Sequence, residues 1–414
     1  MGSKPLSILP YLLLPLSLFL LVYSAYWGFL LVAGASSLRR SKAALPLPGD
    51  LPTVSVIVAT KNEETVVGRL IASLRALNYD PSKLEFVIAE SGSTDGTRAA
   101  VARLAGTDPR IRLVTPDGEG KGNALNAALR VATGELFFFL DADCVPEKDF
   151  LLKTVSHYVQ GKDVVVGYSR TINSAQSLIT RLAVFEDILW RVMSAGKARL
   201  GLSVPLAGPC SVVSRRAMLS VDFQFRNVLT EDIELWMRLL KSGHVAVFAD
   251  TFVWMEAPSG LKALLRQRMR WYRGYLETAL RHADVAHYTS PRRAADAMLM
   301  LSTPFFAMLS LFSYFISSMS LPQAVSDAGI FAFIALFLGA NVMGFFALNI
   351  GLAYILGEDA MSMIRFSPLI YMYTTLLSVS SFLAILNMLV GWPKGWSKTE
   401  RSGYVDAEVP LVRG

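Results

Sequence analysis

The sequence has few of the residues that define several common protein classes. Its 414 residues include only two cysteines, Cys144 and Cys210, and four histidines. Two cysteines exclude a disulfide framework and a zinc site built on four thiolates, and they fit a reducing compartment. Charged residues make up only 18% of the chain, whereas hydrophobic residues make up 53%. This composition excludes an intrinsically disordered protein.

Charge is missing altogether from four long stretches of the chain. Residues 5–38, 297–326, 328–357 and 366–393 contain no Asp, Glu, Lys or Arg, and each exceeds the roughly 20 residues that a helix needs to cross a bilayer. Residues 39–296 hold 61 of the 73 charged side chains. The sequence therefore predicts an integral protein of the cell membrane, with a polar domain between membrane anchors, and excludes a wholly soluble protein.

The positive charges that follow the first apolar stretch predict its orientation. Arg39, Arg40 and Lys42 come directly after it, and positive flanks stay on the cytoplasmic side. The polar domain is then cytoplasmic. We expect five segments: an N-terminal transmembrane helix at 5–38, the cytoplasmic domain at 39–258, an amphipathic interfacial region at 259–296, three transmembrane or re-entrant helices at 297–393 and a basic tail at 394–414.

The tail raises a question of topology. Three spans after a cytoplasmic domain would put the tail outside, but its basic residues favour the inside. One of the three stretches could instead be re-entrant or lie along the interface, with Pro304 and Pro368 as break points. The net charge of +7 is explained by anionic lipid or an anionic substrate, so we expect no nucleic-acid partner.

The polar domain is predicted to be an α/β unit with a mostly parallel sheet. Short apolar runs at 54–60, 85–89, 111–114 and 136–140 predict strands, and helical patterns between them predict crossovers. Asn62 is expected to cap the helix that follows the first strand. Ligands of such sheets bind at the carboxyl ends of the strands. Glu90 and the pair Asp141 and Asp143 lie at two of those ends.

Asp141-Ala142-Asp143 is the first candidate for chemistry. It follows the apolar run LFFFL, so two carboxylates emerge together from a buried strand and point the same way. Hard oxygen ligands at this spacing suit Mg²⁺ or Mn²⁺ that also binds phosphate oxygens. Taken alone, aspartates at the end of a strand are as often simple turn formers.

A second acidic group, Thr230-Glu231-Asp232, opens an amphipathic helix. Thr230 as a cap, with the two acids favouring the positive end of the helix dipole, is a sufficient structural explanation. The catalytic alternative makes Asp232 a general base that accepts a proton from a hydroxyl group of the acceptor.

The third feature is Gln267-Arg268-Met269-Arg270-Trp271, within the basic amphipathic stretch 260–283, where Glu277 is the only acidic residue. Such a helix with aromatic residues lies naturally in a membrane interface, which would account for most of its charges. Arg270 could instead hold a diphosphate through paired N–H donors. Trp271 could stack on a sugar or anchor at lipid headgroups.

In this order and spacing the motifs resemble those of the membrane-integrated family 2 glycosyltransferases, which include ceramide glucosyltransferase and the cellulose, hyaluronan and poly-N-acetylglucosamine synthases. The matching segments are Asn62-Glu63, residues 90–97, residues 121–126, Asp141–Asp143, Thr230–Asp232 and Gln267–Trp271. The resemblance implies a GT-A fold, which is Rossmann-like, and a metal-dependent, inverting hexosyltransferase that uses a nucleotide-diphosphate sugar, expected to be a UDP-sugar.

The resemblance also implies roles for individual residues. Asn62 and Glu63 would lie near the nucleoside, Glu90 beside the nucleobase and Lys121 near the phosphates. Asp141 would hold the ribose and metal, Asp143 the metal and diphosphate, and Asp232 would be the base, with Glu231 in the substrate site beside it. Gln267, Arg270 and Trp271 would close over the diphosphate and the acceptor. Two positions depart from many relatives: Glu90-Ser91 replaces Asp-Asp, and Lys61 replaces a tyrosine.

Three hypotheses remain for the function. Four apolar stretches are few for a polymer channel, so we favour a membrane lipid as the acceptor. The second hypothesis is a processive polysaccharide synthase, with a growing glycan as acceptor and with a channel borrowed from a homo-oligomer or a partner. The third is a non-catalytic nucleotide-sugar-binding membrane subunit, motivated by the altered Glu90-Ser91 site.

Overall fold

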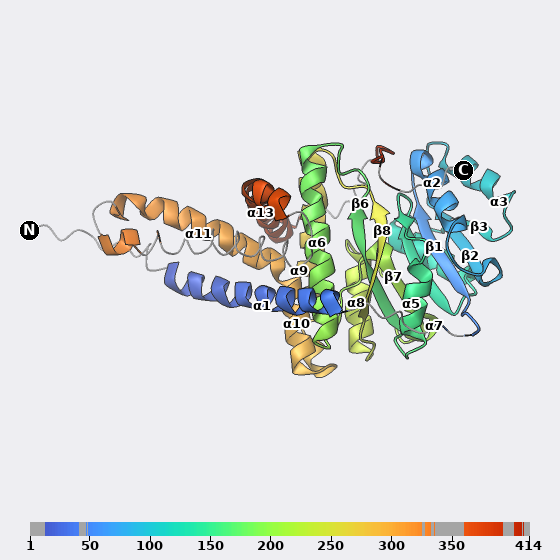
Figure 1. Cartoon of the computed structure of the whole chain (residues 1–414), viewed down its shortest axis with the longest axis horizontal. Coiled ribbons are helices and arrows are strands. Elements are labelled where there is room, and N and C mark those ends of the chain that lie inside the picture. Colours follow the sequence, from blue (N-terminus) through green and yellow to red (C-terminus); the bar gives the residue numbers. More distant parts are fainter. Residues whose placement is uncertain are drawn as a thin grey trace, which may run out of the picture.

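The computed structural model describes residues 13–40, 47, 49–324, 328–332, 335, 360–391, 401–407 and 409. An α/β domain carries a narrower group of helices that projects from one side of it (Figure 1). Most of the apolar stretch 328–357 lies outside the described residues, as do residues 5–12 of the first stretch and residues 394–400 of the tail.

One eight-stranded mixed sheet forms the α/β domain, in the order β3-β2-β1-β4-β7-β6-β8-β5. The parallel half consists of β1 (Val54–Thr60), β2 (Leu84–Glu90), β3 (Ile111–Val114) and β4 (Leu136–Asp141). The other half consists of β5 (Val145–Pro146), β6 (Val164–Thr171), β7 (Ser211–Ser214) and β8 (Val247–Met255). Here β6 and β8 are parallel, while β7 and β5 pair antiparallel with their neighbours. The predicted mostly parallel α/β fold is confirmed.

Helices cover both faces of the sheet, which explains why β4 is apolar at successive positions. Phe138 packs on the face covered by α2 (Glu64–Arg75), α3 (Thr97–Ala105) and α5 (Phe150–Tyr158). Phe137 and Phe139 pack on the other face, against α4 (Lys121–Val131), α7 (Arg215–Leu219) and α8 (Glu231–Lys241). Because successive side chains of a strand alternate between faces, a strand that is covered twice needs no polar positions.

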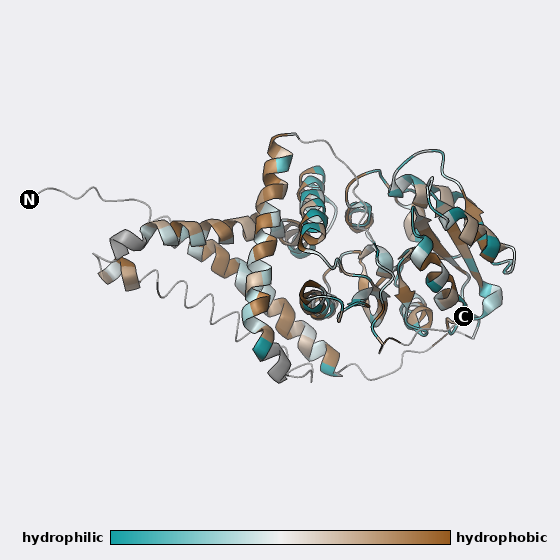
Figure 2. Ribbon diagram, turned by 90° about the horizontal axis from the view of Figure 1, so that it is seen from above, coloured by the Kyte–Doolittle hydropathy of each residue, from teal (hydrophilic) through white to brown (hydrophobic). Residues whose placement is uncertain are grey.

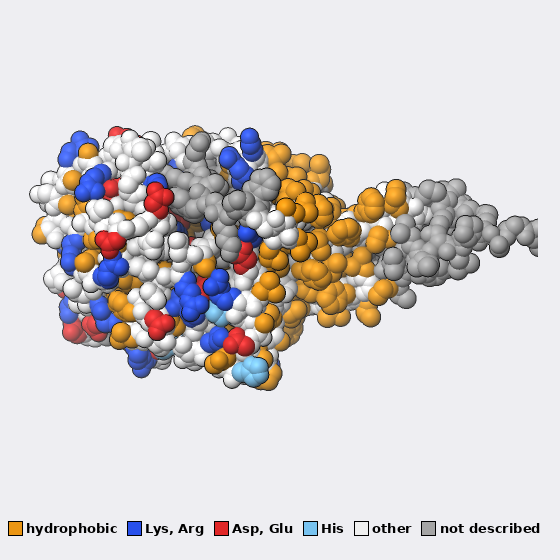
Figure 3. Space-filling view, turned by 180° about the vertical axis from the view of Figure 1, so that it is seen from behind, with side chains coloured by type: hydrophobic (Ala, Val, Ile, Leu, Met, Phe, Trp, Pro, Cys, Tyr) orange, Lys and Arg blue, Asp and Glu red, His pale blue; other side chains and the backbone are white. Residues whose placement is uncertain are grey.

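The remaining helices connect the α/β domain to an apolar arm. They are α1 (Leu13–Arg40), α6 (Leu178–Arg199), α9 (Leu261–Arg281), α10 (Pro291–Leu301), α11 (Thr303–Ala324) and α13 (Ala360–Leu389). Figure 2 shows hydrophobic residues along the arm, and in Figure 3 the charged side chains gather on the wide part of the molecule while the narrow part is hydrophobic. Within the described residues, Pro15–Arg39 and Arg365–Leu389 are long and apolar enough to cross a membrane, and the bent pair Pro291–Leu301 and Thr303–Ser320 could form a third span.

Only one of the two prolines lies at a break. The second apolar stretch bends by 53° at Ser302, and Pro304 follows two residues later, in the first turn of α11, where the missing N–H of a proline costs no helical hydrogen bond. Pro368 is inside α13, which continues through it. Figure 1 shows α13 nearly end-on while α1 and α11 run across the view, so α13 crosses the direction of these two helices.

The described part of the tail lies against the α/β domain. Asp406 accepts hydrogen bonds from the backbone N–H groups of Ser174 and Ala175, at 2.7 and 3.0 Å. Val409 packs against Val145 and Ile172. The described part of the tail is therefore docked on the α/β domain.

Helix α1 packs closely on α6 because a glycine from each helix lies at the crossing. A Cβ atom on Gly34 would be 1.8 Å from the carbonyl oxygen of Val192, and one on Gly196 would be 2.1 Å from that of Leu30. Close by, the fully buried Lys197 of α6 pairs with Asp296 of α10 at 2.6 Å, and Asp296 also accepts the hydroxyl of Tyr26 from α1. Backbone contact and a buried ion pair thus join the arm to the domain.

We expect Gly34→Ala to destabilise the protein by about 1–3 kcal/mol, because the new methyl group must push the two helix backbones apart. Gly28→Ala is the matched control, since Gly28 lies on the same helix and a Cβ atom added there would meet nothing within 4 Å. This control should be neutral or slightly stabilising because alanine favours a helix. The midpoint of thermal unfolding in detergent measures both, and equal midpoints would contradict the proposed close packing.

Candidate functional site

The register of the parallel strands brings the acidic residues to one edge of the sheet. Thr60 of β1 pairs with Glu90 of β2, and Ala59 pairs with Asp141 of β4. The carboxyl ends of three strands therefore meet at the same level, and Asp143 follows two residues later. This is the edge at which ligands of α/β sheets bind.

A cavity of about 230 Å³ opens at this edge. It brings together the segments that the sequence analysis had singled out, although they lie far apart along the chain. Nearly all the predicted site residues line it: Glu63, Lys121, Asp141, Asp143, Glu231, Asp232, Gln267, Arg270 and Trp271. Asn62 and Glu90 are not among the lining residues.

Lys121, the first residue of α4, bridges two of the carboxylates. Its Nζ lies 2.8 Å from Oδ1 of Asp141 and 2.9 Å from Oε1 of Glu231. Burial alone would lower the pKa of this amine, but the charges of Asp141 and Glu231 raise it above its usual value. Burial alone would raise the pKa of Asp141, but Lys121 holds it below its usual value. Both groups are therefore charged at neutral pH.

Asp232 is placed differently. Its Oδ2 accepts the backbone N–H of Gly208 at 2.9 Å, and its Oδ1 accepts that of Ile233 at 2.8 Å. Burial and the negative charge of Glu231 raise the pKa of Asp232 to about 6. This carboxylate is ionised at neutral pH but binds a proton more readily than an exposed aspartate, as a general base requires.

The prediction that the side chain of Thr230 caps α8 is wrong. Thr230 is the N-cap residue of α8, but its side chain makes no capping hydrogen bond, and its Oγ1 is buried without a hydrogen-bond partner within the described structure. Instead Thr230 packs against α9, where a Cβ atom on Gly274 would lie 2.5 Å from its Cγ2. Gly274 thus allows α9 to approach the acidic end of α8.

This close approach places Arg270 at the cavity. Its Nη1 donates to the carbonyl oxygen of Leu229 at 3.1 Å. Its Nε is buried and has no hydrogen-bond partner among the residues that the structure describes. A buried guanidinium N–H without a partner is costly, so this atom is suited to an oxygen of a bound anion.

The membrane interface was offered as the explanation for most of the charges of α9, but two of its basic residues are buried in protein. Arg268 pairs with Glu186 of α6, donates to Gln267 Oε1 at 2.6 Å and lies 4.1 Å from the ring centroid of Trp271. Arg273 is 9% exposed and pairs with Glu277. The membrane-interface explanation is therefore wrong for Arg268 and Arg273. Arg268 holds Gln267 and Trp271, both of which line the cavity.

Asn62 and Glu90 shape a loop beside the cavity. We had expected Asn62 to cap α2, but it does not. Its Oδ1 accepts the backbone N–H of Thr94 at 2.8 Å, and its φ of 55° is left-handed. Glu90 is buried, accepts the backbone N–H of Ser93 and pairs with Arg98 at 3.2 Å. Burial opposes the charge of Glu90, but the bonds from Ser93 and Arg98 lower its pKa. Both residues thus fix residues 91–97, and Ser91 itself lines the cavity.

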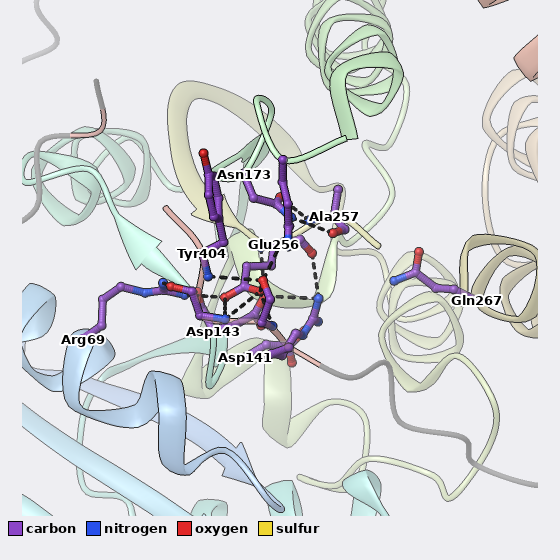
Figure 4. A network of polar contacts seen from close by, with 12 residues as sticks. Arg69, Asp141, Asp143, Asn173, Glu256, Ala257, Gln267 and Tyr404 are labelled. Carbon is purple, nitrogen blue, oxygen red and sulfur yellow. Dashed lines mark hydrogen bonds and ion pairs between the residues drawn. The ribbon is translucent and has the colours of Figure 1, made fainter. Parts of the chain in front are cut away.

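Two residues next to Asp143 were not predicted from the sequence. Oδ2 of Asp143 accepts the backbone N–H of Glu256 at 3.0 Å (Figure 4). It also lies 3.3 Å from Nη1 of Arg401. Glu256 could have been found, because it follows the end of β8 as Asp143 follows the end of β4. Arg401 could not, since the tail offers only an isolated basic residue. Burial raises the pKa of Asp143, and Arg401 opposes this rise.

The carboxylates fit a divalent cation that is also coordinated by phosphate oxygens of a bound substrate. No group of three or more His, Cys, Asp or Glu side chains in the described part of the chain could hold a metal alone. Mg²⁺ and related ions are commonly bound by one or two carboxylates together with phosphate oxygens of the substrate. Asp143 and Asp141 offer this kind of incomplete site, and the unpartnered Nε of Arg270 lines the same cavity.

Comparisons with known proteins give the family. Residues 55–221 match the description "Glycosyl transferase family 2". The beta-monoglucosyldiacylglycerol synthase of Nostoc sp. (strain PCC 7120 / SAG 25.82 / UTEX 2576) is 28% identical over 264 residues, which are 62% of this chain and 56% of that protein. The poly-beta-1,6-N-acetyl-D-glucosamine synthase of Staphylococcus aureus (strain COL) is 25% identical over 237 residues, which are 56% of this chain and 57% of that protein. The chain thus spans little more than half the length of these synthases.

A solved structure shares the fold. The mannosyltransferase PcManGT from Pyrobaculum calidifontis, in complex with GDP-Man and Mn²⁺, superposes with a TM-score of 0.61 at 20% identity, over 91% of this chain and 100% of that one. The predicted GT-A fold with flanking apolar helices is therefore confirmed. From the matching model, the relatives and the fold, residues 55–221 are a glycosyltransferase family 2 domain.

Proposed function

We propose that this chain is an inverting glycosyltransferase that moves a sugar from a nucleotide-diphosphate sugar to a lipid hydroxyl at the membrane surface. The observation that carries the proposal is that Asp143, Asp232 and Arg270 line one cavity. A divalent cation held by Asp143 and Asp141 would neutralise charge on the leaving diphosphate.

The residues of the chain divide the reaction between them. Arg270 offers its Nε to the diphosphate, where planar paired donors match phosphate oxygens. Asp232 takes the proton of the acceptor hydroxyl while the acceptor oxygen bonds to the anomeric carbon and the bond from that carbon to the diphosphate breaks. Glu231 is less suited to this step because Lys121 pairs with it at 2.9 Å. Attack from the side opposite the leaving group inverts the anomeric centre.

The wall of the cavity supports a lipid acceptor. Trp190 of α6 and Trp271 and Tyr275 of α9 line it, and these two helices pack directly against α1 and α13. An acceptor with an apolar body can therefore reach the acidic residues along helices that also contact the apolar arm. The relative named as a beta-monoglucosyldiacylglycerol synthase supports the same class of acceptor.

A processive polysaccharide synthase is the second candidate, favoured by the relative named as a poly-beta-1,6-N-acetyl-D-glucosamine synthase. In either case we place the α/β domain on the cytoplasmic face, because Arg39 and Arg40 lie at the domain end of α1 and positive flanks stay inside.

Purified protein in detergent with a native lipid extract should convert a UDP- or GDP-sugar, in the presence of Mg²⁺ or Mn²⁺, into a glycolipid that carries one sugar. Chromatography and mass spectrometry of the lipid fraction measure the product. A ladder of products would favour the polysaccharide synthase. No turnover of any donor, with nucleotide binding retained, would favour a non-catalytic subunit.

Asp232→Asn should lower the rate of transfer by about 10²–10⁴-fold, the usual contribution of a positioned base, while binding of UDP with Mn²⁺ stays unchanged. In the wild type the rate should fall about tenfold per pH unit below about 6, because the pKa of Asp232 is about 6 and the protonated carboxyl cannot accept a proton. The pH–rate profile and calorimetric titration measure these effects. Normal turnover by Asp232→Asn would show that the base is another residue.

Arg270→Lys should reduce kcat/KM by about 10–100-fold, since a point charge cannot replace the paired donors of a guanidinium. Arg266→Lys is the matched control, because Arg266 is exposed on the same helix. Steady-state kinetics with varied donor concentration separate the two variants. Equal losses of kcat/KM in the two variants would show that Arg270 does not bind the diphosphate and is one of the basic residues of the membrane interface.

A further inference from the structure

The C-terminal part of the chain contributes a cation to the candidate site. We name the described residues 401–407 and 409 the C-terminal strap. Nη1 of Arg401 donates to the carbonyl oxygen of Glu256 at 2.6 Å and lies 3.3 Å from Oδ2 of Asp143. The side chain of Arg401 is 11% exposed and that of Asp143 is 1% exposed, so water screens this pair little.

The strap is fixed by contacts that do not involve the side chain of Arg401. The carboxylate of Glu256 accepts the backbone N–H groups of Ser402, at 2.9 Å, and Gly403, at 3.1 Å. Arg69 pairs with Glu256 at 3.0 Å and holds it in place (Figure 4). Further along the strap, Asp406 accepts two backbone N–H groups just after the end of β6. The docking of the strap backbone therefore does not depend on the guanidinium of Arg401.

Arg401 puts a positive charge next to the carboxylate that we propose as a ligand of the divalent cation. Burial raises the pKa of Asp143 and the charge of Arg401 opposes this rise, while Arg401 adds to the effect of Lys121 in lowering the pKa of Asp141. Burial would lower the pKa of Arg401 itself, but the charges of Asp143, Asp141 and Glu63 raise it. Oδ2 of Asp143 already accepts the backbone N–H of Glu256. A guanidinium and a divalent cation on one buried carboxylate would repel each other strongly.

We propose that Arg401 is the counter-ion of Asp143 in the donor-free protein, and that its guanidinium must leave Asp143 before this carboxylate binds a divalent cation. This inference rests on the proposed function, because it takes Asp143 as a metal ligand. Arg401 keeps the buried carboxylates charge-balanced at rest and lowers their affinity for a cation that arrives without a diphosphate. Arg401 is thus a positioning residue, which acts through Asp143.

The test is binding of Mn²⁺ alone to the full chain in detergent, followed by the electron paramagnetic resonance signal of the free ion. Arg401→Gln should bind Mn²⁺ about tenfold or more tightly than the wild type, because one positive charge next to the carboxylates is removed. Arg401→Lys keeps that charge and should bind Mn²⁺ like the wild type. An affinity of Arg401→Gln that is equal to or weaker than that of the wild type overturns the inference.

Two further variants make the result specific. Arg170→Gln removes the same charge from an exposed side chain of β6 that stacks on Phe252 and Trp254, and it should not change Mn²⁺ affinity. Asp143→Asn, combined with Arg401→Gln, should lose the gained affinity. If the double variant keeps it, Asp143 is not the metal ligand and the proposed function fails at this residue. If Arg401→Gln gains nothing while Asp143→Asn alone still weakens Mn²⁺ binding, only the role of Arg401 is wrong.

Discussion

Charge balance among the carboxylates at one edge of the sheet is the constraint on which the site depends. Asp141, Asp143, Glu231 and Asp232 share one cavity, and an unpaired carboxylate in such surroundings would either bind a proton or destabilise the fold. The compensating cations come from three distant segments: Lys121 from α4, Arg270 from α9 and Arg401 from the strap. Each of them lowers the pKa of Asp141. Because these cations stabilise the carboxylates, α4, α9 and the strap must all lie close to the carboxyl ends of the strands.

The carboxylates are not stabilised equally, and the resulting difference in their pKa values separates their proposed roles in the reaction. Asp141 is held ionised by Lys121, whereas the pKa of Asp232 is raised to about 6 by burial and by Glu231. Two carboxylates of the same type, close together, thus differ in proton affinity because of their surroundings, a pattern that separates acid and base roles in many enzymes. The group with the higher proton affinity is the one that receives the acceptor's proton in the proposed reaction.

The sequence predicted those features that local pattern controls. The strand Val54–Thr60 was found with its bounds because a run of β-branched residues is bounded by a proline and polar residues. The side chains of Asn62 and Thr230 were misinterpreted, because a polar residue next to a helix end can bond locally or across the fold. Asn62 bonds to Thr94 and Thr230 packs on α9. The ion pair of Arg401 with Asp143 joins distant parts of the chain, and no local rule indicates such a partner.

Helix α9 shows why a basic amphipathic composition does not by itself identify a membrane surface. Its arginines at 266, 268, 270 and 273 lie within one short segment, yet they meet solvent, Glu186, the cavity and Glu277 in turn. Arg266, Arg270 and Arg273 are three or four residues apart and share one face, so the element that lies beside the helix at each level decides what each of them meets. Arg268 and Trp271 are three apart and stack, while Gly274, four residues after Arg270, removes the side chain that would keep this face away from Thr230. A single glycine thus sets how closely α9 approaches the acidic end of α8, and with it whether Arg270 reaches the carboxylates or only the membrane surface.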